Sequence, residues 1–415
     1  MCICIYVKNL IHRKGTVVVL KDVSGYIKEC ENHKEIIIYG AGIAGHLLQR
    51  RLEEKYGIKI NYFCTSFEDY HIDNETGLEV LNRNQLEAGH LQALYIVALG
   101  ITYSQKAYEG IKQYLIQIGV CAEDIIVDTN AWIIYEAKPY VDARGKLHVY
   151  TLSYHVTKQC NLKCKMCGQL LFGLVPRRSF PSEQIENDME TIFRIIDKID
   201  VLKLIGGEVM VYAKLDQLID LINRYHEQVG LLKIYTNGVA EPKERLLQAL
   251  TKYEGKIQVT ISDYGELSNA KDAWIRFGKS NNIKINILGF SLKDKNGYKG
   301  WIDCTQIEDL GENEETIRQK YNTCGQRLDY VLEDSIIGKC TSFHMINYAL
   351  KKNLRSDEAV YINSNSSDEE KRKQVLKLGE DDISLDVCKY CIWGSSIRDT
   401  LPRYPAAEQL DKMPR

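Results

Sequence analysis

The stretch HVYTLSYHVTKQCNLKCKMC, residues 148–167, joins an apolar strand pattern to three closely spaced cysteines. Valine, threonine and tyrosine are frequent in its first half, which indicates a buried β-strand. The cysteines follow this strand with the spacing Cys160-x3-Cys164-x2-Cys167. Thiols are soft ligands that suit zinc or iron–sulfur, but each of those centres ordinarily takes four ligands. The spacing therefore leaves a fourth ligand to be identified.

Strand and helix patterns alternate on both sides of this stretch. From residue 149 to about 300, strand patterns alternate with helical ones, which predicts a parallel sheet in an α/β fold. That region has no glycine-rich nucleotide turn, so we expect a full barrel or a partial (β/α)6 TIM barrel in preference to an open sheet. Residues 35–130 show a second alternation of the βαβ kind, which predicts a small Rossmann-like domain.

Length and charge restrict the class of protein. At 415 residues the chain is too long for one compact core, and we expect two or three domains. The net charge of -2 argues against a dominant nucleic-acid surface. The longest apolar run, ALYIVALGI at 93–101, is too short to span a bilayer, and the N-terminus is the reverse of a secretory signal. We expect a cytoplasmic protein with no nucleic-acid or membrane partner.

The thirteen cysteines are distributed unevenly, and in a cytosolic protein we do not expect them to form disulfides. Eight fall in two groups, and the other five are expected to be small buried side chains. These five are Cys2, Cys4, Cys30, Cys64 and Cys121. One group is the triplet at 160–167, and the second comprises Cys304, Cys324, Cys340, Cys388 and Cys391.

A Cys-x3-Cys-x2-Cys loop after the first strand of a βα barrel resembles the signature of the radical S-adenosylmethionine (SAM) superfamily. The resemblance implies that Cys160, Cys164 and Cys167 bind three irons of a 4Fe–4S cluster and that SAM chelates the fourth. The missing ligand would then be the cosubstrate. The resemblance also implies a flavodoxin- or ferredoxin-type reductant as partner. A partial zinc site or a chance group of cysteines stays open as the alternative.

The end of the next strand fits the same resemblance. LKLIGGEVM ends with Gly206, Gly207 and Glu208, and resembles the family's Gly-Gly-Glu-Pro motif, which meets the amino group of SAM. Glycines at this point allow the backbone to approach a ligand closely. Val209 stands where the family has proline, a departure from the motif in the turn after the two glycines.

Further cofactor-binding candidates follow the third and fourth strands. By resemblance these are Asn237 in IYTNG and Ser262 in TISDYG, although an ordinary turn serine is an equal alternative for Ser262. Met166 stands where many family members carry an aromatic residue, and its thioether can still cover adenine. Ile287 and Leu288 on the fifth strand are candidates to flank adenine, but core packing is the stronger expectation for both.

The second cysteine group reads as a cysteine, a hairpin, a cysteine, a gap and a Cys-x2-Cys pair. This order resembles the twitch domain, an abbreviated SPASM arrangement that holds one auxiliary 4Fe–4S cluster. The resemblance implies four ligands, Cys324, Cys340, Cys388 and Cys391. A four-thiolate structural zinc stays open as the alternative. Cys304 is a fifth cysteine in this group. It could replace one of the four ligands, leave a site open to substrate, or be a buried thiol.

IIIYGAGIAG places Gly40, Gly42 and Gly45 between a strand and a helix, the context of a phosphate-binding turn. The second strand ends in Cys64 and Thr65, without the acid that NAD requires, which argues against an NAD dehydrogenase. The unit resembles the small Rossmann domain in front of some bacterial sugar acyltransferases and methyltransferases. A purely architectural or dimerising domain is an equal alternative.

We expect six segments along the chain. The polar residues 351–374 are expected to be a mobile loop, and the proline-rich tail to lie along the surface or without fixed structure. The segments are an N-terminal extension at 1–34, the Rossmann-like domain at 35–130, a linker at 131–148, the partial barrel at 149–300, the twitch/SPASM-like α+β domain at 301–397 and the tail at 398–415.

The resemblance implies a radical SAM enzyme that cleaves SAM to methionine and a 5′-deoxyadenosyl radical, which abstracts hydrogen from an unactivated carbon. The Rossmann-like unit favours a carbohydrate or nucleotide-linked small molecule as substrate. Modification of a ribosomal peptide is the alternative, and a zinc-stabilised binding adaptor is the non-enzymatic one. Candidates for contact with substrate at the barrel mouth are Arg177, Arg178, Asp263 and Tyr264, for which solvated loop positions are the common alternative.

Overall fold

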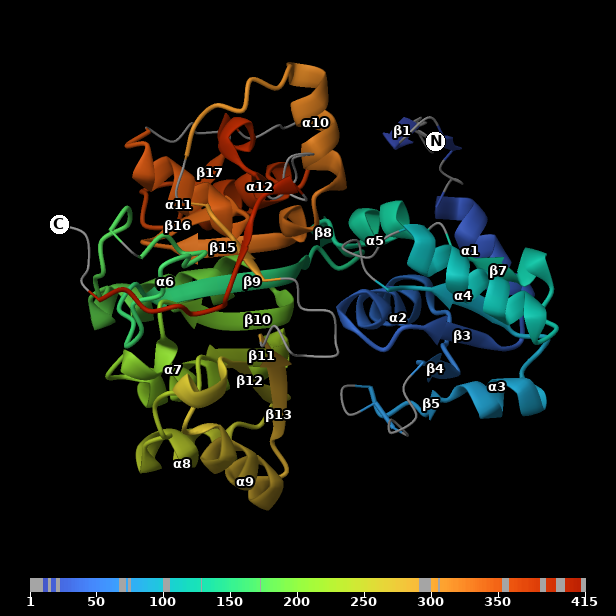
Figure 1. The fold of residues 1–415 in the computed structure, drawn as a ribbon, viewed down its shortest axis with the longest axis horizontal. Helices are drawn as coiled ribbons and strands as arrows, with labels where there is room; N and C mark the ends of the chain where they lie inside the picture. The colour runs from blue at the N-terminus through green and yellow to red at the C-terminus, as the bar shows by residue number, and fades with distance from the viewer. Residues whose placement is uncertain are drawn as a thin grey trace. The chain divides into compact units, whose positions relative to one another are not determined.

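The computed structural model (Figure 1) divides into two compact units, Met1–Ala137 and Lys138–Arg415, which we describe one at a time. No described helix is both long enough and apolar enough to cross a membrane. The residues that the structure describes are 10–13, 16–19, 23–66, 72–73, 76–99, 105–127, 129–171, 173–290, 300–304, 307–352, 358–380, 386–392 and 400–411.

The first unit contains a five-stranded parallel sheet in the order β5-β4-β3-β6-β7. Strands β3 and β6 are buried along their whole length, as expected for parallel strands covered by helices on both faces. A separate antiparallel pair joins β1 (Leu10–Arg13) to β2 (Thr16–Val19). The other elements are α1 (Val23–Asn32), β3 (Ile36–Tyr39), α2 (Ile43–Tyr56), β4 (Tyr62–Cys64), β5 (Val80–Leu81), α3 (Arg83–Gly89), β6 (Leu94–Val97), α4 (Gln105–Gln117), β7 (Ile125–Ile126) and α5 (Asn130–Glu136).

The scattered cysteines of this unit differ in their burial. Cys30 and Cys64 are buried, as expected for small apolar side chains. Cys121 is exposed, so the prediction of a buried side chain is wrong for this residue. Cys2 and Cys4 lie outside the described residues.

The second unit is built on a nine-stranded mixed sheet, in the order β13-β12-β11-β10-β9-β15-β16-β17 with β8 paired to β9. Strands β13 to β9 and the neighbouring β15 are parallel. The elements of its first part are β8 (Tyr140–Val141), β9 (Leu147–Thr157), α6 (Ser182–Ile195), β10 (Lys198–Gly206), α7 (Leu215–Asn223), β11 (Val229–Thr236), α8 (Glu244–Lys252), β12 (Ile257–Asp263), α9 (Lys271–Asn281) and β13 (Lys284–Gly289).

The α/β class with a parallel sheet is therefore confirmed. Each of the parallel strands β9 to β12 is followed by a helix, and Figure 1 shows α7, α8 and α9 beside strands β10 to β13. The described strands pair in a linear order, with no pairing between β13 and β17. Among the described residues, the strand pairing thus does not close the sheet into a barrel.

The two faces of the central strand β9 differ in polarity. Leu152, Tyr154 and Val156 belong to a large apolar core that also contains residues of α6, because side chains alternate between the faces of a strand. The opposite face carries polar groups: the hydroxyl of Ser153 donates to the carboxylate of Asp329 at 2.8 Å. This face points away from the helices that cover the apolar side.

The last part of the chain joins the same sheet. Strand β15 pairs in parallel with β9, and β16 and β17 extend the sheet in antiparallel fashion. The expected hairpin within 301–397 is present, but it continues the central sheet. The elements are β14 (Trp301–Ile302), α10 (Glu314–Thr323), β15 (Asp329–Glu333), β16 (Ile336–Lys339), α11 (Thr341–Ala349), β17 (Ala359–Tyr361), α12 (Asp368–Lys377) and β18 (Arg403–Tyr404).

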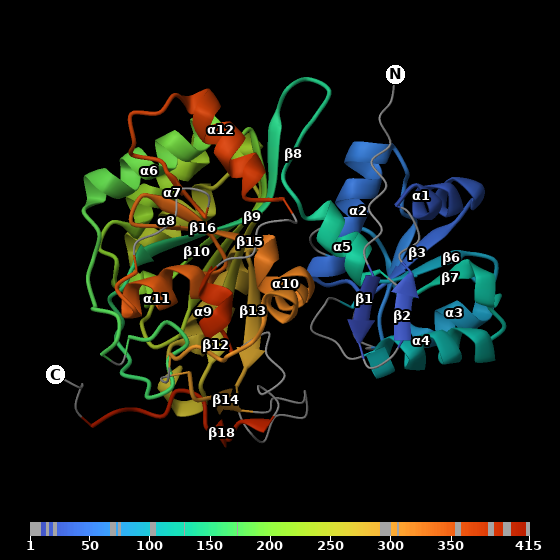
Figure 2. The ribbon, with the colours of Figure 1, turned by 90° about the horizontal axis from the view of Figure 1, so that it is seen from above.

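One segment differs from its predicted state. Part of the stretch 351–374, expected to be a mobile loop, forms β17 and most of α12. Helix α12 begins with a capping box, in which the Ser367 side chain accepts from the amide of Glu370 and the Glu370 carboxylate accepts from the amide of Ser367. The tail also has structure, because β18 pairs with β14 beside the C-terminal segment (Figure 2).

Candidate active site

The three cysteines of the triplet lie on the loop after the carboxyl end of β9. Cys164 is buried, whereas Cys160 and Cys167 are half-buried. The thiols are close enough to influence one another: burial raises the pKa of Cys160 to about 11 and that of Cys164 to about 12, and neighbouring cysteines add to both shifts. The structure thus brings the predicted triplet together, in surroundings that favour protonated thiols.

Arg177 holds the cysteine loop from one side. Its guanidinium donates to the carbonyl oxygens of Leu171 at 3.1 Å, Cys160 at 3.0 Å and Leu162 at 2.7 Å. A planar fork of five N–H donors is suited to gripping several carbonyls at once. Arg177 therefore fixes the path of the loop, a role that its position in the sequence did not indicate.

Gly206 and Gly207 end β10 against the end of β9. A Cβ at Gly206 would lie 2.3 Å from the carbonyl oxygen of Thr157, and one at Gly207 would lie 2.2 Å from that of Gln159. Gly206 also has φ +150, and the register between β9 and β10 shifts at this point. Only glycine permits this approach of two backbones. The glycine pair therefore sets the β10 end directly beside the cysteine loop.

Glu208 is buried and both of its carboxylate oxygens accept hydrogen bonds. One oxygen accepts from the amide of Met210 at 3.0 Å and the hydroxyl of Thr236 at 2.7 Å, and the other accepts from the amide of Asn237 at 2.7 Å. Burial raises the pKa of Glu208, and these hydrogen bonds oppose the shift. Glu208 thus ties the end of β10 to the end of β11.

Asn237 connects the end of β11 to the cysteine loop. Its side-chain amide donates to Asn161 Oδ1 at 2.7 Å and lies 3.9 Å from Cys160 Sγ. The amide of Leu162 points at the same sulfur, at 3.5 Å. Cys160 therefore faces two N–H donors before any metal binds.

The end of β12 places Tyr264 against the triplet. Tyr264 packs with Cys160, Cys164 and Cys167 in one cluster, and burial raises its pKa. Its neighbour Asp263 pairs with Lys271 at 2.6 Å. Tyr264 therefore borders the predicted metal centre, whereas Asp263 is committed to an ion pair beside it.

The remaining candidates of the first site lie around these groups. Ser262 is half-buried at the end of β12 and hydrogen-bonds through its side chain to Tyr264. Met166 is buried within the cysteine loop, and Ile287 and Leu288 on β13 are 37% and 38% exposed. The side chains of Ile287 and Leu288 are thus not packed in the core, although core packing was the stronger expectation from the sequence.

Arg178 points away from the triplet. Its guanidinium pairs with Asp334 in the β15–β16 turn at 2.5 Å and lies 5.0 Å over the ring of Phe180. Both charged side chains are more than 40% exposed. The structure therefore does not bring Arg178 together with the cysteines.

The second cysteine group also comes together. Cys340, Cys388 and Cys391 pack in one cluster. Burial raises the pKa of Cys340 far above its usual value, and Cys391, Cys388 and Cys324 add to this shift. Cys340 has φ +63 at the start of α11, an uncommon backbone state for a residue other than glycine.

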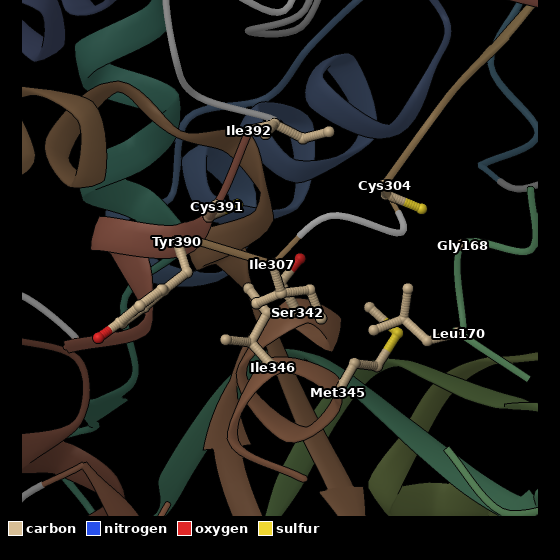
Figure 3. A pocket seen from close by; sticks show the side chains of 10 residues that line it. All are labelled: Gly168, Leu170, Cys304, Ile307, Ser342, Met345, Ile346, Tyr390, Cys391 and Ile392. Carbon is tan, nitrogen blue, oxygen red and sulfur yellow. The ribbon is translucent and has the colours of Figure 1, made fainter. Parts of the chain in front are cut away.

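Cys304 lies between the two groups. Its thiol points at the carbonyl oxygen of Cys167 at 3.9 Å, and both Cys167 and Cys391 add to the burial that raises its pKa to about 12. Figure 3 shows Cys304 at the edge of a small pocket, with Leu170 and Met345 among its mostly apolar lining. The pocket thus joins the surroundings of the two cysteine groups.

The chemistry of these donor sets can be tested against a metal. Within the ranges described, no three His, Cys, Asp or Glu side chains converge as they would around one ion. A four-thiolate zinc needs its sulfurs about 2.3 Å from a single point. The cysteines of an iron–sulfur cube bind different irons at its corners, so they need not converge in this way.

The glycine turn of the first unit forms the expected strand-to-helix junction. Gly40 has φ +125, and a Cβ at Gly45 would lie 1.9 Å from the carbonyl oxygen of Gly40. A Cβ at Gly42 would meet nothing within 4 Å. Gly40 and Gly45 are thus required by the junction, and the surroundings of Gly42 at the start of α2 are open.

Comparison with known proteins found partial similarities. No family model matches the chain. A GTP 3′,8-cyclase of Helicobacter pylori is 26% identical over 164 residues, which are 38% of this chain and 47% of the relative. Among solved structures, anSMEcpe with bound AdoMet has a TM-score of 0.36 at 14% identity, with 55% of this chain and 83% of that chain covered. BtrN in complex with AdoMet and 2-DOIA has a TM-score of 0.27 at 20% identity, with 34% and 56% covered.

The cysteine loop and the glycine pair beside it are the features by which the chain resembles the radical SAM enzymes. The match with the curated relative spans less than half of the relative's length. The reaction and the substrate of this chain do not follow from it.

Proposed function

We propose that the protein reductively cleaves SAM at an iron–sulfur cluster held by Cys160, Cys164 and Cys167. The observation that carries this proposal is the meeting of four adjacent parallel strand ends around three thiols. Ligands of α/β proteins bind at the carboxyl ends of the strands. The thiols follow β9, and the ends of β10 and β11 are tied to the cysteine loop through Glu208 and Asn237.

The surroundings of the thiols suit a cluster with one open corner. Amide donors already point at the sulfurs of Cys160 and Cys164, and such donors stabilise the negative charge that sulfur carries in a cluster. When bound and reduced, the cluster supplies the electron that splits SAM into methionine and a 5′-deoxyadenosyl radical. The protein's own contribution is to hold the loop, through Arg177, and to cover it, through Tyr264.

We propose that a second iron–sulfur cluster is bound by Cys324, Cys340, Cys388 and Cys391. Their mutual proximity supports this set, and the hairpin β15–β16 stands between the first two cysteines as in a twitch domain. We also propose that the first unit is Rossmann-like, which its strand order and its glycine turn support. The six domain boundaries given above are retained as part of the proposal.

A polar small molecule, such as a carbohydrate or nucleotide-linked compound, is the substrate class that we propose. The polar face of the sheet supports it: Lys203 pairs with Asp329 at 3.1 Å, and their side chains are 18% and 14% exposed. Tyr235 is close enough to both charges for each to influence its pKa. A row of fixed polar groups is suited to hydroxyl-rich or charged substrates.

A ribosomal peptide is the second candidate. The small pocket beside Cys304 favours it, because Leu170, Met345 and Ile346 give it an apolar lining next to the cysteine groups.

Anaerobic reconstitution tests the proposed function. We expect about eight irons and eight sulfides per chain. With dithionite and SAM, methionine and 5′-deoxyadenosine should form, and Cys164→Ala should abolish both. Two zincs per chain and no cleavage of SAM would support the binding adaptor instead.

A further inference from the structure

The C-terminal segment 403–410, which we call the strap, runs beside the cysteine loop. The amide of Lys165 donates to the carbonyl oxygen of Glu408 at 2.7 Å, and the amide of Leu410 donates to that of Lys163 at 2.8 Å. An isolated antiparallel bridge pairs Cys164 with Gln409. Backbone groups of the loop therefore form hydrogen bonds with a segment about 245 positions away in sequence.

Gln409 uses both ends of its side-chain amide at this contact. Its oxygen accepts from the amide of Lys163 at 2.7 Å. Its nitrogen donates to the carbonyl oxygen of Ala407 at 2.6 Å and to the sulfur of Cys164 at 3.5 Å. Because every one of these contacts requires the same orientation of the amide, an N–H group is fixed in place toward the sulfur.

The backbone of the strap is held in an uncommon conformation beside the same cysteine. Ala407 has φ +54 and is 1% exposed, in a cluster with Leu162 and Cys164. Such a backbone state costs about 1–3 kcal/mol for a residue other than glycine and persists only where the surroundings enforce it. The strap is thus fitted to the loop and does not merely lie near it.

The strap is anchored upstream of this contact. Tyr404 pairs with Trp301 in the β14–β18 ladder, and the ring of Trp301 meets Tyr264 edge-on with centroids 5.7 Å apart. A Cβ at Gly300 would lie 2.9 Å from the carbonyl oxygen of Tyr404. The strap, β14 and Tyr264 therefore form one continuous wall against the cysteine loop.

We propose that Gln409 is a positioning residue that tunes the metal centre at the triplet through its hydrogen bond to Cys164. N–H donors to cluster sulfurs stabilise the reduced, more negative state and raise the reduction potential. Cys160 receives its donors from its own loop and from β11, whereas Cys164 receives this one from the strap. The inference rests on the proposed function, because it requires a cluster on Cys164.

Two substitutions separate the sulfur donor from the loop anchor. Gln409→Ala removes both contacts. Gln409→Glu keeps an oxygen for the amide of Lys163, but replaces the N–H group at Cys164 by a second acceptor oxygen. Gln248→Glu is a control with the same change of charge, on the exposed face of α8.

The test is a redox titration of anaerobically reconstituted protein, followed by electron paramagnetic resonance (EPR). The signal that changes when SAM is added reports the cluster on the triplet, and any other iron–sulfur signal is an internal control. At a solution potential equal to the wild-type midpoint potential, the ratio of reduced to oxidised cluster should be about 3-fold lower in Gln409→Ala than in the wild type. This is the effect expected for the loss of one hydrogen bond. Gln409→Glu should lower it further, and Gln248→Glu should leave it unchanged.

The outcomes separate this inference from the proposed function. A SAM-responsive signal with the same midpoint in wild type and in Gln409→Glu would overturn the role of Gln409. If Gln409→Ala fails to fold, Gln409→Glu decides, because it preserves the shape of the side chain. Absence of any SAM-responsive signal from the wild-type protein would instead refute the cluster itself.

Discussion

Replacement of Arg177 should open the cysteine loop. Arg177→Ala removes three hydrogen bonds from a charged, half-buried donor to backbone carbonyls. At about 1 kcal/mol each, they sum to about 3 kcal/mol, or about a 100-fold larger population of the open loop. Arg177→Lys keeps the charge but replaces the fork by a single amine, so we expect it to lose about 2 kcal/mol.

Hydrogen exchange of the metal-free full-length chain, measured by mass spectrometry, gives this population directly. Amides such as that of Leu170, which donates to the carbonyl oxygen of Cys167 at 2.8 Å, should exchange about 100-fold faster in Arg177→Ala. Arg178→Ala is the matched control, because an exposed ion pair contributes about 0–1 kcal/mol. Equal acceleration in the two variants, or less than tenfold in Arg177→Ala, would refute the clamp.

Three further predictions concern other parts of the second unit. Gly207→Ala should prevent iron loading and lower the melting temperature, because its Cβ would lie 2.2 Å from a carbonyl oxygen; iron content and thermal unfolding measure this. Burial raises the pKa of Asp188 to about 6, above an unfolded value of about 3.9. The protonated carboxyl group therefore stabilises the folded protein below pH 4. This contribution, about 3 kcal/mol, is lost as the pH rises through 6. Asp188→Asn should flatten that dependence in urea unfolding between pH 4 and pH 7. Cys304→Ser should keep all irons of the wild type, whereas Cys340→Ser should lose about four, as iron analysis would show.

The sequence predicted what depends on local pattern. The alternation of β-branched strands with amphipathic helices indicated the parallel sheets, and the spacing of Cys160, Cys164 and Cys167 indicated the enzyme class that we propose. The same pattern placed Gly206 and Gly207 at a strand end. The close approach of these glycines to β9 is a tertiary contact between two strands. It can still be predicted from the sequence, because only glycine allows so close an approach.

Other contacts leave no such trace. Arg177 and Arg178 are adjacent and chemically identical, but one grips the loop and the other pairs with Asp334 on the surface. The side-chain direction of each depends on tertiary packing. Gln409 lies in a polar, proline-containing tail that was predicted to lie along the surface or without fixed structure. Its contact with the cysteine loop was not predicted, because hydrogen bonds to a distant loop have no sequence period. The roles proposed for Asp263, Tyr264 and Ser262 stay predictions.

The strap has a consequence for how the protein is made. The cysteine loop leaves the ribosome about 245 residues before the segment that covers it. At 5–20 residues per second, this interval lasts about 10–50 s. During that time nascent chains expose Cys164 without the strap, so the metal centre that we propose would be most accessible before the strap emerges. Slower translation between the cysteine loop and the strap should lengthen that interval and, equally, the exposure of the thiols to oxidants.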